Sequence, residues 1–549
     1  MVSNRNPNPT GGRRWRVQAP RDRYPQDREP QPTPAPAAGA GLARAAGAVF
    51  IVNLASRALG FVRDMVIASA YGATPATDAF MVAYTLPYLL QSVLGMAFIT
   101  VMVPVVTASL AQDREQEAWY LASGIFNRVA LLLVAVTAAG IAFTPQLISL
   151  MAPGFAPGQA ALAGELTRIM FPSLVLVGLG MLLTGILNAC RVFALPAAAP
   201  AAANLLVILA VVLAGRRFWI HSLAWGTLLG FVAFFLIQWP ALRRLGFRYV
   251  FTWAGDRPEV GRVVASLLPV ALATSINQIY LAINRALASG LDPGRITALD
   301  LANRVLNLPI GIVAAAIATV IFPVMASQAA AGRKEELARA SSAGLGLVFF
   351  LSLPVTVGMM VLASPLIQLL FGRGAFGAGA TALTATALLY FALGLPALAA
   401  KMLITRTYYA LGRYRVPLAT GLASVAVDIG LSWWWLPILG HGGLALANSV
   451  AATFDLALLL WLVRRYLPTT SYGPVLFSLT QTIVASLVMG VLVGRLVQSF
   501  PPPAGSLALL LWVAAAALLG AAIFLLSARI LRVPEISLLT RSFFSRPKG

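Results

Sequence analysis

Charged residues are scarce in this chain. Only 11% of its 549 residues are Asp, Glu, Lys or Arg, whereas a typical soluble domain carries about 25%. Hydrophobic residues make up 59% of the sequence, and the mean hydropathy is +0.82. This composition excludes an ordinary soluble globular protein and indicates an integral membrane protein.

Cysteine and histidine are almost absent as well. Cys190 is the only cysteine, which excludes an intrachain disulfide and a thiolate metal cluster. The only histidines are His221 and His441, too few to favour a His-based metal site. Asp and Glu number 18, and those inside apolar stretches are single and scattered. A membrane glycosyltransferase or phosphatase needs a carboxylate cluster, so we expect neither an enzyme nor a metal site.

Long apolar runs, in contrast, fill most of the chain. Between about residues 42 and 530, about 14 stretches approach the ~20 residues that cross a bilayer as a helix. The sequence therefore predicts an all-α polytopic membrane protein with about 14 transmembrane helices. The predicted spans are 42–70, 77–108, 118–144, 160–189, 194–214, 219–241, 260–288, 296–327, 338–364, 379–405, 417–437, 441–463, 473–494 and 505–528.

The distribution of positive charge predicts the orientation. The net charge is +22, but with both termini placed in the cytoplasm most Lys and Arg fall on the cytoplasmic side. This is the positive-inside bias of membrane proteins, so no nucleic-acid partner is expected. Residues 1–41, rich in Pro, Arg and Ala, are expected to form a disordered basic cytoplasmic tail, either solvated or touching anionic headgroups. The outer side carries Arg216, Arg217, Arg295, Arg373 and Arg495.

The first half of the sequence recurs in the second half. The pairs that match at an offset of 221 or 222 residues are Arg63 and Arg285, Asp78 and Asp300, Pro87 and Pro309, Ala189 and Ala410, and Pro196 and Pro417. A nearly constant offset across distant segments is difficult to obtain by chance, so the chain is predicted to contain an internal repeat.

The repeat predicts two six-helix lobes, residues 42–250 and 260–467. Because six is even, both lobes enter the membrane from the same side and are parallel repeats. Such lobes enclose a central cavity, and alternating access arises when they rock against each other. Two further helices within residues 473–530 fall outside the repeat, and residues 531–549 are expected to form a cytoplasmic C-terminal tail.

Several charges lie inside the predicted spans. The stretch "SRALGFVRDM" (residues 56–65) contains Arg57, Arg63 and Asp64, and Asp300 and Arg304 are spaced i, i+4 in a later span. A charge at mid-bilayer costs about 2.5 to 3.5 kcal/mol and therefore usually faces a cavity or a partner. One interpretation is internal ion pairing, with Arg57 snorkelling to headgroups. The other is an anion-binding cavity, because the arginine fork suits phosphate and stays charged when desolvated.

Three further polar residues leave alternatives open. Lys401 is either a cavity cation or a residue that snorkels to the interface. Asp428 is a lone carboxylate in a predicted span, with Asn284 as its candidate neighbour on another helix. Such a carboxylate binds Na⁺, carries a proton or is a hydrogen-bonded structural residue.

Four segments resemble one known family. They are "SRALGFVRDMVIASAYGATPATDAFMVAYTLP" (56–87), "NRVLNLPIGIVAAAIATVIFP" (303–323), "YYALGRYRVPLATGL" (408–422) and "LGHGGLALANS" (439–449). These segments are similar to the MurJ (MviN) family of lipid II flippases, in the MOP superfamily that also holds MATE drug exporters and polysaccharide flippases. The resemblance extends from about residue 42 to 530, and SRxLGFxRD and TDAF are its most specific motifs.

The resemblance implies a transporter of the bacterial cytoplasmic membrane. It implies that lipid II, an undecaprenyl-pyrophosphate-linked disaccharide-pentapeptide, moves from the inner to the outer leaflet for peptidoglycan synthesis. Its expected partners are lipid II or a similar polyprenyl-pyrophosphate glycolipid, membrane lipids and the cell-wall synthesis machinery. No cofactor is expected, and the driving force is Na⁺, H⁺ or the membrane potential. In the family, helices 13 and 14 form a groove for the lipid tail, here residues 473–530.

The resemblance also implies roles for individual residues. Cavity arginines bind the pyrophosphate in the family, and acidic residues are functional beside them. Asp428 and Asn284 resemble a family Na⁺ site only in part, because an acidic residue is expected near Asn284. The positions that match substrate-binding residues are Arg57, Arg63, Arg304, Asp64, Asp78 and Lys401.

The chain also departs from the family pattern. Gln91 and Ser92 stand where the family usually carries an Arg pair, and Gly95-Met96 stands where a Glu follows. An acidic residue is also common near Asn307. The loss of two cavity cations weakens the expectation of pyrophosphate binding, and Lys401 is the candidate for compensating it.

Three other functions fit part of the pattern. A flippase for another polyprenyl-pyrophosphate-linked glycan would carry a cargo with the same anionic group, so every feature that indicates anion binding fits it equally. A MATE-like cation exporter is disfavoured because its cavity should carry acidic residues. A non-transporting membrane scaffold would tolerate the loss of Arg63 or Arg304, whereas a flippase would not.

Overall fold

The computed structural model describes residues 37–253, 261, 280–317, 321–467 and 473–536. These residues form helices joined by short turns, and no strand occurs among them. The chain divides after Ala48, and the residues from Val49 onward form one compact unit. Of the predicted tails, residues 1–36 and 537–549 lie outside the described residues, and the first helix begins at Ala37, before the predicted tail boundary at residue 41.

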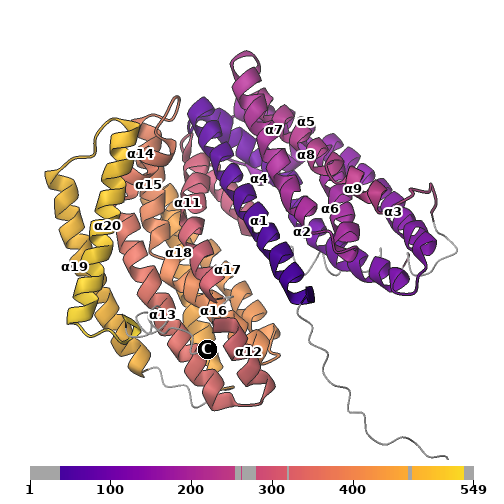
Figure 1. The fold of residues 1–549 in the computed structure, drawn as a ribbon. Coiled ribbons are helices and arrows are strands. Elements are labelled where there is room, and N and C mark those ends of the chain that lie inside the picture. The colour runs from indigo at the N-terminus through magenta and orange to yellow at the C-terminus, as the bar shows by residue number, and fades with distance from the viewer. Residues whose placement is uncertain (1–36, 254–260, 262–279, 318–320, 468–472, 537–549) are drawn as a thin grey trace, which may run out of the picture. The chain divides into compact units, whose positions relative to one another are not determined.

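The helices follow one another with short connections (Figure 1). Those of the first half are α1 (Ala37–Tyr71), α2 (Pro75–Leu110), α3 (Glu115–Ala142), α4 (Thr144–Met151), α5 (Pro157–Met170), α6 (Ser173–Ala189), α7 (Ala194–Phe218), α8 (Ile220–Leu236) and α9 (Trp239–Arg244). Residues 280–288 are also helical. Those that follow are α11 (Arg295–Ala316), α12 (Phe322–Ala330), α13 (Lys334–Val361), α14 (Ala363–Phe371), α15 (Ala378–Ala392), α16 (Leu395–Ala410), α17 (Arg415–Leu439), α18 (His441–Val463), α19 (Gly473–Ser499) and α20 (Ser506–Ile530).

The described helices confirm the all-α membrane-protein class. Ten spans are long and apolar enough to cross a membrane, or eleven if α15 and α16, bent by 45°, count as one broken span. The predicted number of fourteen is not confirmed, and most of the predicted span 260–288 lies outside the described residues. The predicted span 379–405 breaks before Pro396, whose ring removes a backbone donor from the helix.

The offset of the repeat recurs in the helix boundaries. Helix α7 begins at Ala194 and α17 at Arg415, and α8 begins at Ile220 and α18 at His441. Left-handed turn residues match in the same way: Gly72 (φ 66°) and Gly294 (φ 86°), Arg191 (φ 60°) and Gly412 (φ 68°), and Trp219 (φ 45°) and Gly440 (φ 57°). These matches support the internal repeat, while the boundaries 42–250, 260–467 and 473–530 remain predictions.

The turn between α1 and α2 illustrates how local sequence defines a helix end. Helix α1 ends at Tyr71 and is followed by Gly72, whose positive φ suits a residue without a Cβ. Thr74 then caps α2: its side chain accepts from the Thr77 N–H at 3.4 Å, and its own N–H donates to Thr77 Oγ1 at 2.8 Å. Pro75 occupies the first turn of α2, where no backbone donor is needed.

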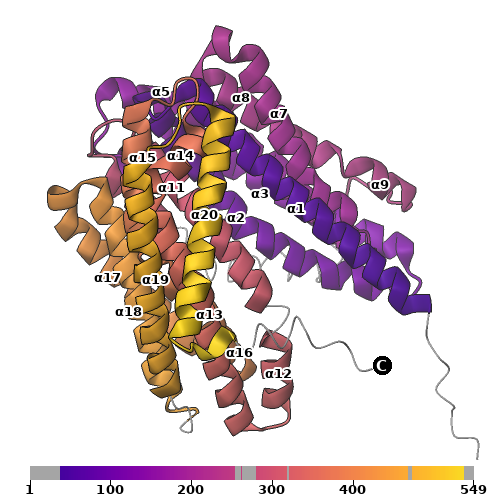
Figure 2. The ribbon, with the colours of Figure 1, turned by 60° about the vertical axis from the view of Figure 1, so that its left-hand side comes forward.

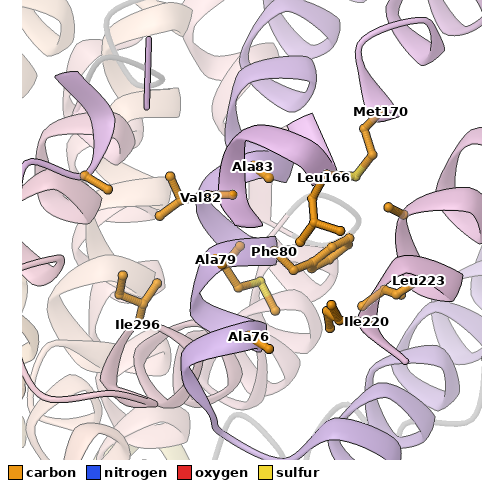
Figure 3. Close-up of a cluster of buried hydrophobic side chains, with 14 of the residues drawn as sticks. Ala76, Ala79, Phe80, Val82, Ala83, Leu166, Met170, Ile220, Leu223 and Ile296 are labelled. Carbon is orange, nitrogen blue, oxygen red and sulfur yellow. The ribbon is translucent and has the colours of Figure 1, made fainter. Parts of the chain in front are cut away.

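A large apolar cluster surrounds α2 (Figure 3). Phe80 lies among Leu166 of α5 and Ile220 and Leu223 of α8, whereas Ile296 of α11 lies on the other side of α2. This cluster joins residues of both halves of the sequence. Helix α2 therefore packs against α5 and α8 on one side and against α11 on the other.

Helices α19 and α20 run side by side (Figures 1 and 2) and share a core with α13. Phe350 of α13 packs on Phe524 of α20 with ring centroids 5.1 Å apart. The chain beyond α20 stays attached, because Glu535 accepts from Ser478 Oγ at 2.5 Å and the Gln481 amide donates to the Leu531 carbonyl at 2.6 Å. Residues 531–536, the start of the predicted cytoplasmic C-terminal tail, are therefore attached to α19.

Candidate functional site

Charged side chains from two helices form a continuous network. On α1, the Arg63 guanidinium donates to its neighbour Asp64 at 2.8 and 3.1 Å. On α11, Arg304 Nε donates to Asp300 at 2.7 Å, one turn away, and Arg304 Nη1 pairs with Asp64 across the two helices. Arg304 therefore bridges two carboxylates, and the i, i+4 pair that the sequence suggested is present.

Arg285, in the helical stretch 280–288, extends this network to α2. It pairs with Asp300 at 3.2 Å, donates to the Met81 carbonyl at 2.9 Å and also bonds the Thr85 hydroxyl. At the opposite end, Arg63 Nη1 donates to the Asn204 amide oxygen of α7 at 2.9 Å. With three arginines and two aspartates, the network carries one net positive charge in a setting where charge is costly.

Two cavities border the network. One encloses about 490 Å³, the other about 280 Å³, and Arg63, Tyr84 and Arg304 line both of them. The larger cavity is also lined by Arg285, Asp300 and residues of α18, and the smaller one by Asp64 and Asn204. The network thus lies between the two cavities: Arg63 and Arg304 line both of them, whereas the buried Arg285 lines only the larger one.

Other predicted site residues lie away from these cavities. Asp78 caps α11: one carboxylate oxygen accepts from the Gly294 N–H at 2.6 Å, and the other accepts from the Thr297 N–H and hydroxyl at 2.8 and 2.7 Å. An acceptor at a helix N-terminus satisfies otherwise unpaired backbone donors. Asp78 is therefore placed to join α2 to α11 and is not among the residues that line the two cavities.

The remaining two predicted cations differ from each other. Arg57 is exposed on α1, and within the described part of the chain it makes no hydrogen bond or ion pair. Lys401 of α16 pairs with the buried Asp455 of α18 at 2.5 Å and does not line either cavity. In this conformation Lys401 is neutralised inside its own group of helices, so it does not replace the cations missing at Gln91 and Ser92.

Asp428 has several hydrogen-bond partners. Its carboxylate accepts from the Tyr280 hydroxyl at 2.6 Å, the Ser432 hydroxyl at 3.1 Å and the Asn448 amide at 3.3 Å. Asn284 lies one turn after Tyr280 and, with Tyr280 and Asn448, lines the larger cavity. The predicted pair thus lies in one cluster, which is uncharged apart from Asp428. Among the described residues, no three His, Cys, Asp or Glu side chains are close enough to hold a metal ion.

An apolar groove of about 450 Å³ lies between α13, α19 and α20. The residues that line it include Pro354, Gly358, Met489, Ala517 and Gly520. A groove of this kind accepts a hydrocarbon chain. Helices α19 and α20 of the predicted segment 473–530 form one side of this groove, and α13 forms the other.

The sequence interpretation missed several partners of the predicted residues. Asn204, Thr85 and Asp455 each bond a charged side chain, yet none was singled out. Asn204 is a lone polar residue in a long apolar stretch, whereas Thr85 and Asp455 stand close to other polar residues, so nothing in their local sequence distinguished them. The Ser92 hydroxyl donates to the Leu89 carbonyl at 3.0 Å, whereas the side chain of Gln91 lies outside the described part of the chain.

Comparison with known proteins gives a consistent result. The family profile described as "Lipid II flippase MurJ" matches residues 67–516. The lipid II flippase MurJ of Burkholderia cenocepacia is 30% identical over 458 residues, which are 82% of this chain and 89% of the relative. The probable lipid II flippase MurJ of Vibrio cholerae serotype O1 is 29% identical over 437 residues, 76% of this chain and 82% of the relative.

Solved structures share the fold. A lipid II flippase MurJ in an inward closed conformation superposes with a TM-score of 0.74 at 23% identity, covering 89% of this chain and 99% of the other. An inward-facing MATE transporter of the MOP superfamily gives a TM-score of 0.62 at 17% identity, covering 77% of this chain and 99% of the other. Because the family profile spans most of the sequence and a relative at 30% identity is matched over most of its length, this chain belongs to the MurJ family of lipid II flippases.

Proposed function

We propose that this protein moves lipid II from the inner to the outer leaflet of the bacterial cytoplasmic membrane by alternating access, for peptidoglycan synthesis. The observation that carries the proposal is the convergence of Arg63, Arg285 and Arg304 on one cavity wall, opposed by only two carboxylates. A MATE-like cation exporter would need a cavity with more acidic than basic residues. Both termini are cytoplasmic in this proposal, and the protein acts as a transporter without catalysis.

The pyrophosphate of the cargo would bind the cavity arginines. In this conformation the guanidiniums of Arg63 and Arg304 are held by Asp64 and Asp300. A pyrophosphate offers more negative charge than either carboxylate and suits the same bidentate geometry. The aspartates therefore keep the arginines ordered when the cavity is empty and compete with the cargo, which assists its release. Arg57, exposed on α1, is an additional cation for the entering headgroup.

The lipid tail would remain outside the central cavities. The apolar groove between α13, α19 and α20 has the chemistry for a polyprenyl chain, because burial of hydrocarbon contributes about 0.8 kcal/mol per CH₂ group. The headgroup and the tail thus use separate surfaces, and this separation supports a flippase over a carrier of small cations.

The membrane potential is the driving force we favour. An inside-negative potential favours outward movement of an anionic headgroup by about 2.3 kcal/mol per charge per 100 mV. Asp428 is surrounded by hydrogen-bond donors from Tyr280, Ser432 and Asn448, which suits a carboxylate held in place by hydrogen bonds. Coupling to Na⁺ or H⁺ through Asp428 is the alternative, and an ion-dependence of transport that is lost in Asp428→Asn would establish it.

Rescue of a flippase-depleted bacterium tests the proposal. Wild-type protein should restore growth, and Arg63→Ala and Arg304→Ala should not, at equal membrane abundance. Arg339→Ala is the matched control, because Arg339 is exposed and forms a surface pair with Glu335. Rescue by all variants would contradict the arginine roles and favour a membrane scaffold. Failure of the wild type despite good expression would instead favour a different polyprenyl-pyrophosphate-linked glycan.

A further inference from the structure

Three aromatic rings form a stack along one face of α2. The ring centroids of Phe80 and Tyr84 are 5.9 Å apart with their planes inclined by 13°, and those of Tyr84 and Tyr88 are 5.8 Å apart with 29° between the planes. The residues are spaced four apart, so they share one side of the helix. Stacking of this kind holds each ring in a fixed orientation.

The stack leads from the protein core into the larger cavity. Phe80 is 5% exposed and belongs to the apolar cluster of Figure 3, whereas Tyr88 is 38% exposed. Tyr84 lies between them, and both tyrosines line the cavity of about 490 Å³. Core packing accounts for Phe80, but it does not account for a large ring at position 88 with an open face. The two tyrosines have no hydrogen-bond partner among the described residues, so their hydroxyl groups also remain available.

The rest of the cavity wall carries amides and guanidinium groups. Asn284, Asn303 and Asn448 line it together with the arginines of the charge network. A pyranose ring has an apolar face of C–H groups and a rim of hydroxyl groups. Aromatic rings accept the apolar face, and amides and guanidiniums bond the hydroxyls, so this combination suits a sugar that is attached to a phosphate.

We propose that Tyr84 and Tyr88 form a tyrosine wall that binds the sugar next to the pyrophosphate of the cargo. The proposal rests on the function proposed above and adds to it a recognition site for the saccharide. Tyr84 lines both cavities with Arg63 and Arg304, so a ligand that bridges the arginines and the tyrosine wall has its phosphate and its first sugar in adjacent positions. The arginines bind any polyprenyl pyrophosphate, and the tyrosine wall distinguishes the glycosylated one.

Binding of two lipids to the purified full-length protein tests the tyrosine wall. The probes are lipid II and undecaprenyl pyrophosphate, which shares the tail and the pyrophosphate but has no sugar. Tyr84→Leu and Tyr88→Leu should each weaken lipid II binding about tenfold and change undecaprenyl pyrophosphate binding by less than about twofold. Tyr88→Phe should retain most of the affinity, because it keeps the ring. Tyr409→Leu is the matched control, because Tyr409 packs against Tyr414 and lines neither cavity.

Each other outcome has a definite meaning. Unchanged lipid II binding in both leucine variants would overturn the tyrosine wall. Equal losses for both lipids would also overturn it, because the tyrosines would then act on pyrophosphate binding or on folding. Thermal unfolding of the same samples distinguishes these two effects. Wild-type protein that binds both lipids equally would contradict sugar recognition and leave pyrophosphate binding intact. Wild-type protein that binds neither lipid would overturn the proposed function and the tyrosine wall together.

Discussion

Each guanidinium in the cavity wall has a partner in the same wall. Arg63 bonds Asp64 and Asn204, and Arg304 bonds Asp64 and Asp300. A buried charge that loses its partner costs several kcal/mol, so these residues function as one network. Substitution of one member therefore removes a contact and also changes the net charge of the network that faces the ligand.

Asp64→Asn tests this competition. The substitution keeps the size of the side chain but raises the net charge of the network from one to two positive charges. Binding of undecaprenyl pyrophosphate to purified protein should become about fivefold tighter, which corresponds to about 1 kcal/mol. The gain should shrink at high salt, because charges near water are screened. Weaker binding that is independent of salt would show that Asp64 only orders the arginines.

The sequence predicted some of these contacts and could not predict others. The i, i+4 spacing indicated the pair of Asp300 and Arg304, because helical geometry determines which residues face each other. The contact between Arg63 and Asp64 was not expected, since adjacent residues point about 100° apart, but a long arginine side chain can fold back. The contact of Arg63 with Asn204 joins segments 141 residues apart, and no local spacing encodes it.

The turns between helices repeat, but their residues do not. Trp219 lies between α7 and α8 with φ 45° and ψ −134°, and Gly440 lies between α17 and α18 with φ 57° and ψ −135°. This conformation suits glycine and costs a residue with a side chain about 1 to 2 kcal/mol. The second half of the chain therefore adopts the turn with little strain, whereas the first half retains a strained tryptophan.

Substitutions at these two turns should have opposite effects. Trp219→Gly should stabilise the protein by about 1 kcal/mol, because the strain is relieved while the Trp219 carbonyl, which accepts from Tyr71 and Ser222, is retained. Gly440→Ala should destabilise it by about 1 kcal/mol or more, since its φ of 57° disfavours a residue with a Cβ, whereas the flexible Arg295 side chain next to it can move aside. Unfolding in mixed micelles measures both changes, and a shift of the same sign at both turns would contradict the argument.

At the level of elements, the sequence predicted most helices and missed their breaks. Hydropathy placed α7, α8, α17 and α18 close to their observed bounds, because long apolar runs must be helical in a bilayer. It did not predict the bend between α15 and α16, since a proline within an apolar run leaves the run long enough to cross.

Contacts between the two halves of the chain recur near predicted outer loops. The Ala375 N–H donates to the Ser69 carbonyl at 2.8 Å, and the Gly154 N–H donates to the Ser289 hydroxyl at 3.0 Å. Asp78, at the start of α2, caps α11 of the second half of the chain. Alternating access requires such contacts to break when the cavity opens to the outside. We expect these contacts to be present in the described conformation and absent from the conformation that is open to the outside.

A reversible cross-link tests this expectation. Ser69→Cys and Ala375→Cys, combined with Cys190→Ser to remove the sole native cysteine, place two thiols where backbone atoms are in hydrogen-bond contact. Oxidation should abolish rescue of flippase-depleted cells, and a reducing agent should restore it. Each single-cysteine variant serves as the control. Full rescue with complete cross-linking would mean that these segments stay together throughout transport.

The measurement that tests the central claim most directly is the appearance of lipid II at the outer face of the membrane. In flippase-depleted cells, a membrane-impermeant enzyme that cleaves lipid II would report the accessible fraction with wild-type protein, Arg304→Ala or no protein. We predict a large accessible fraction with the wild type and a fraction near the empty-cell level with Arg304→Ala at equal abundance. An accessible fraction with Arg304→Ala equal to that of the wild type, or no increase with the wild type, would contradict transport through the arginine-lined cavity.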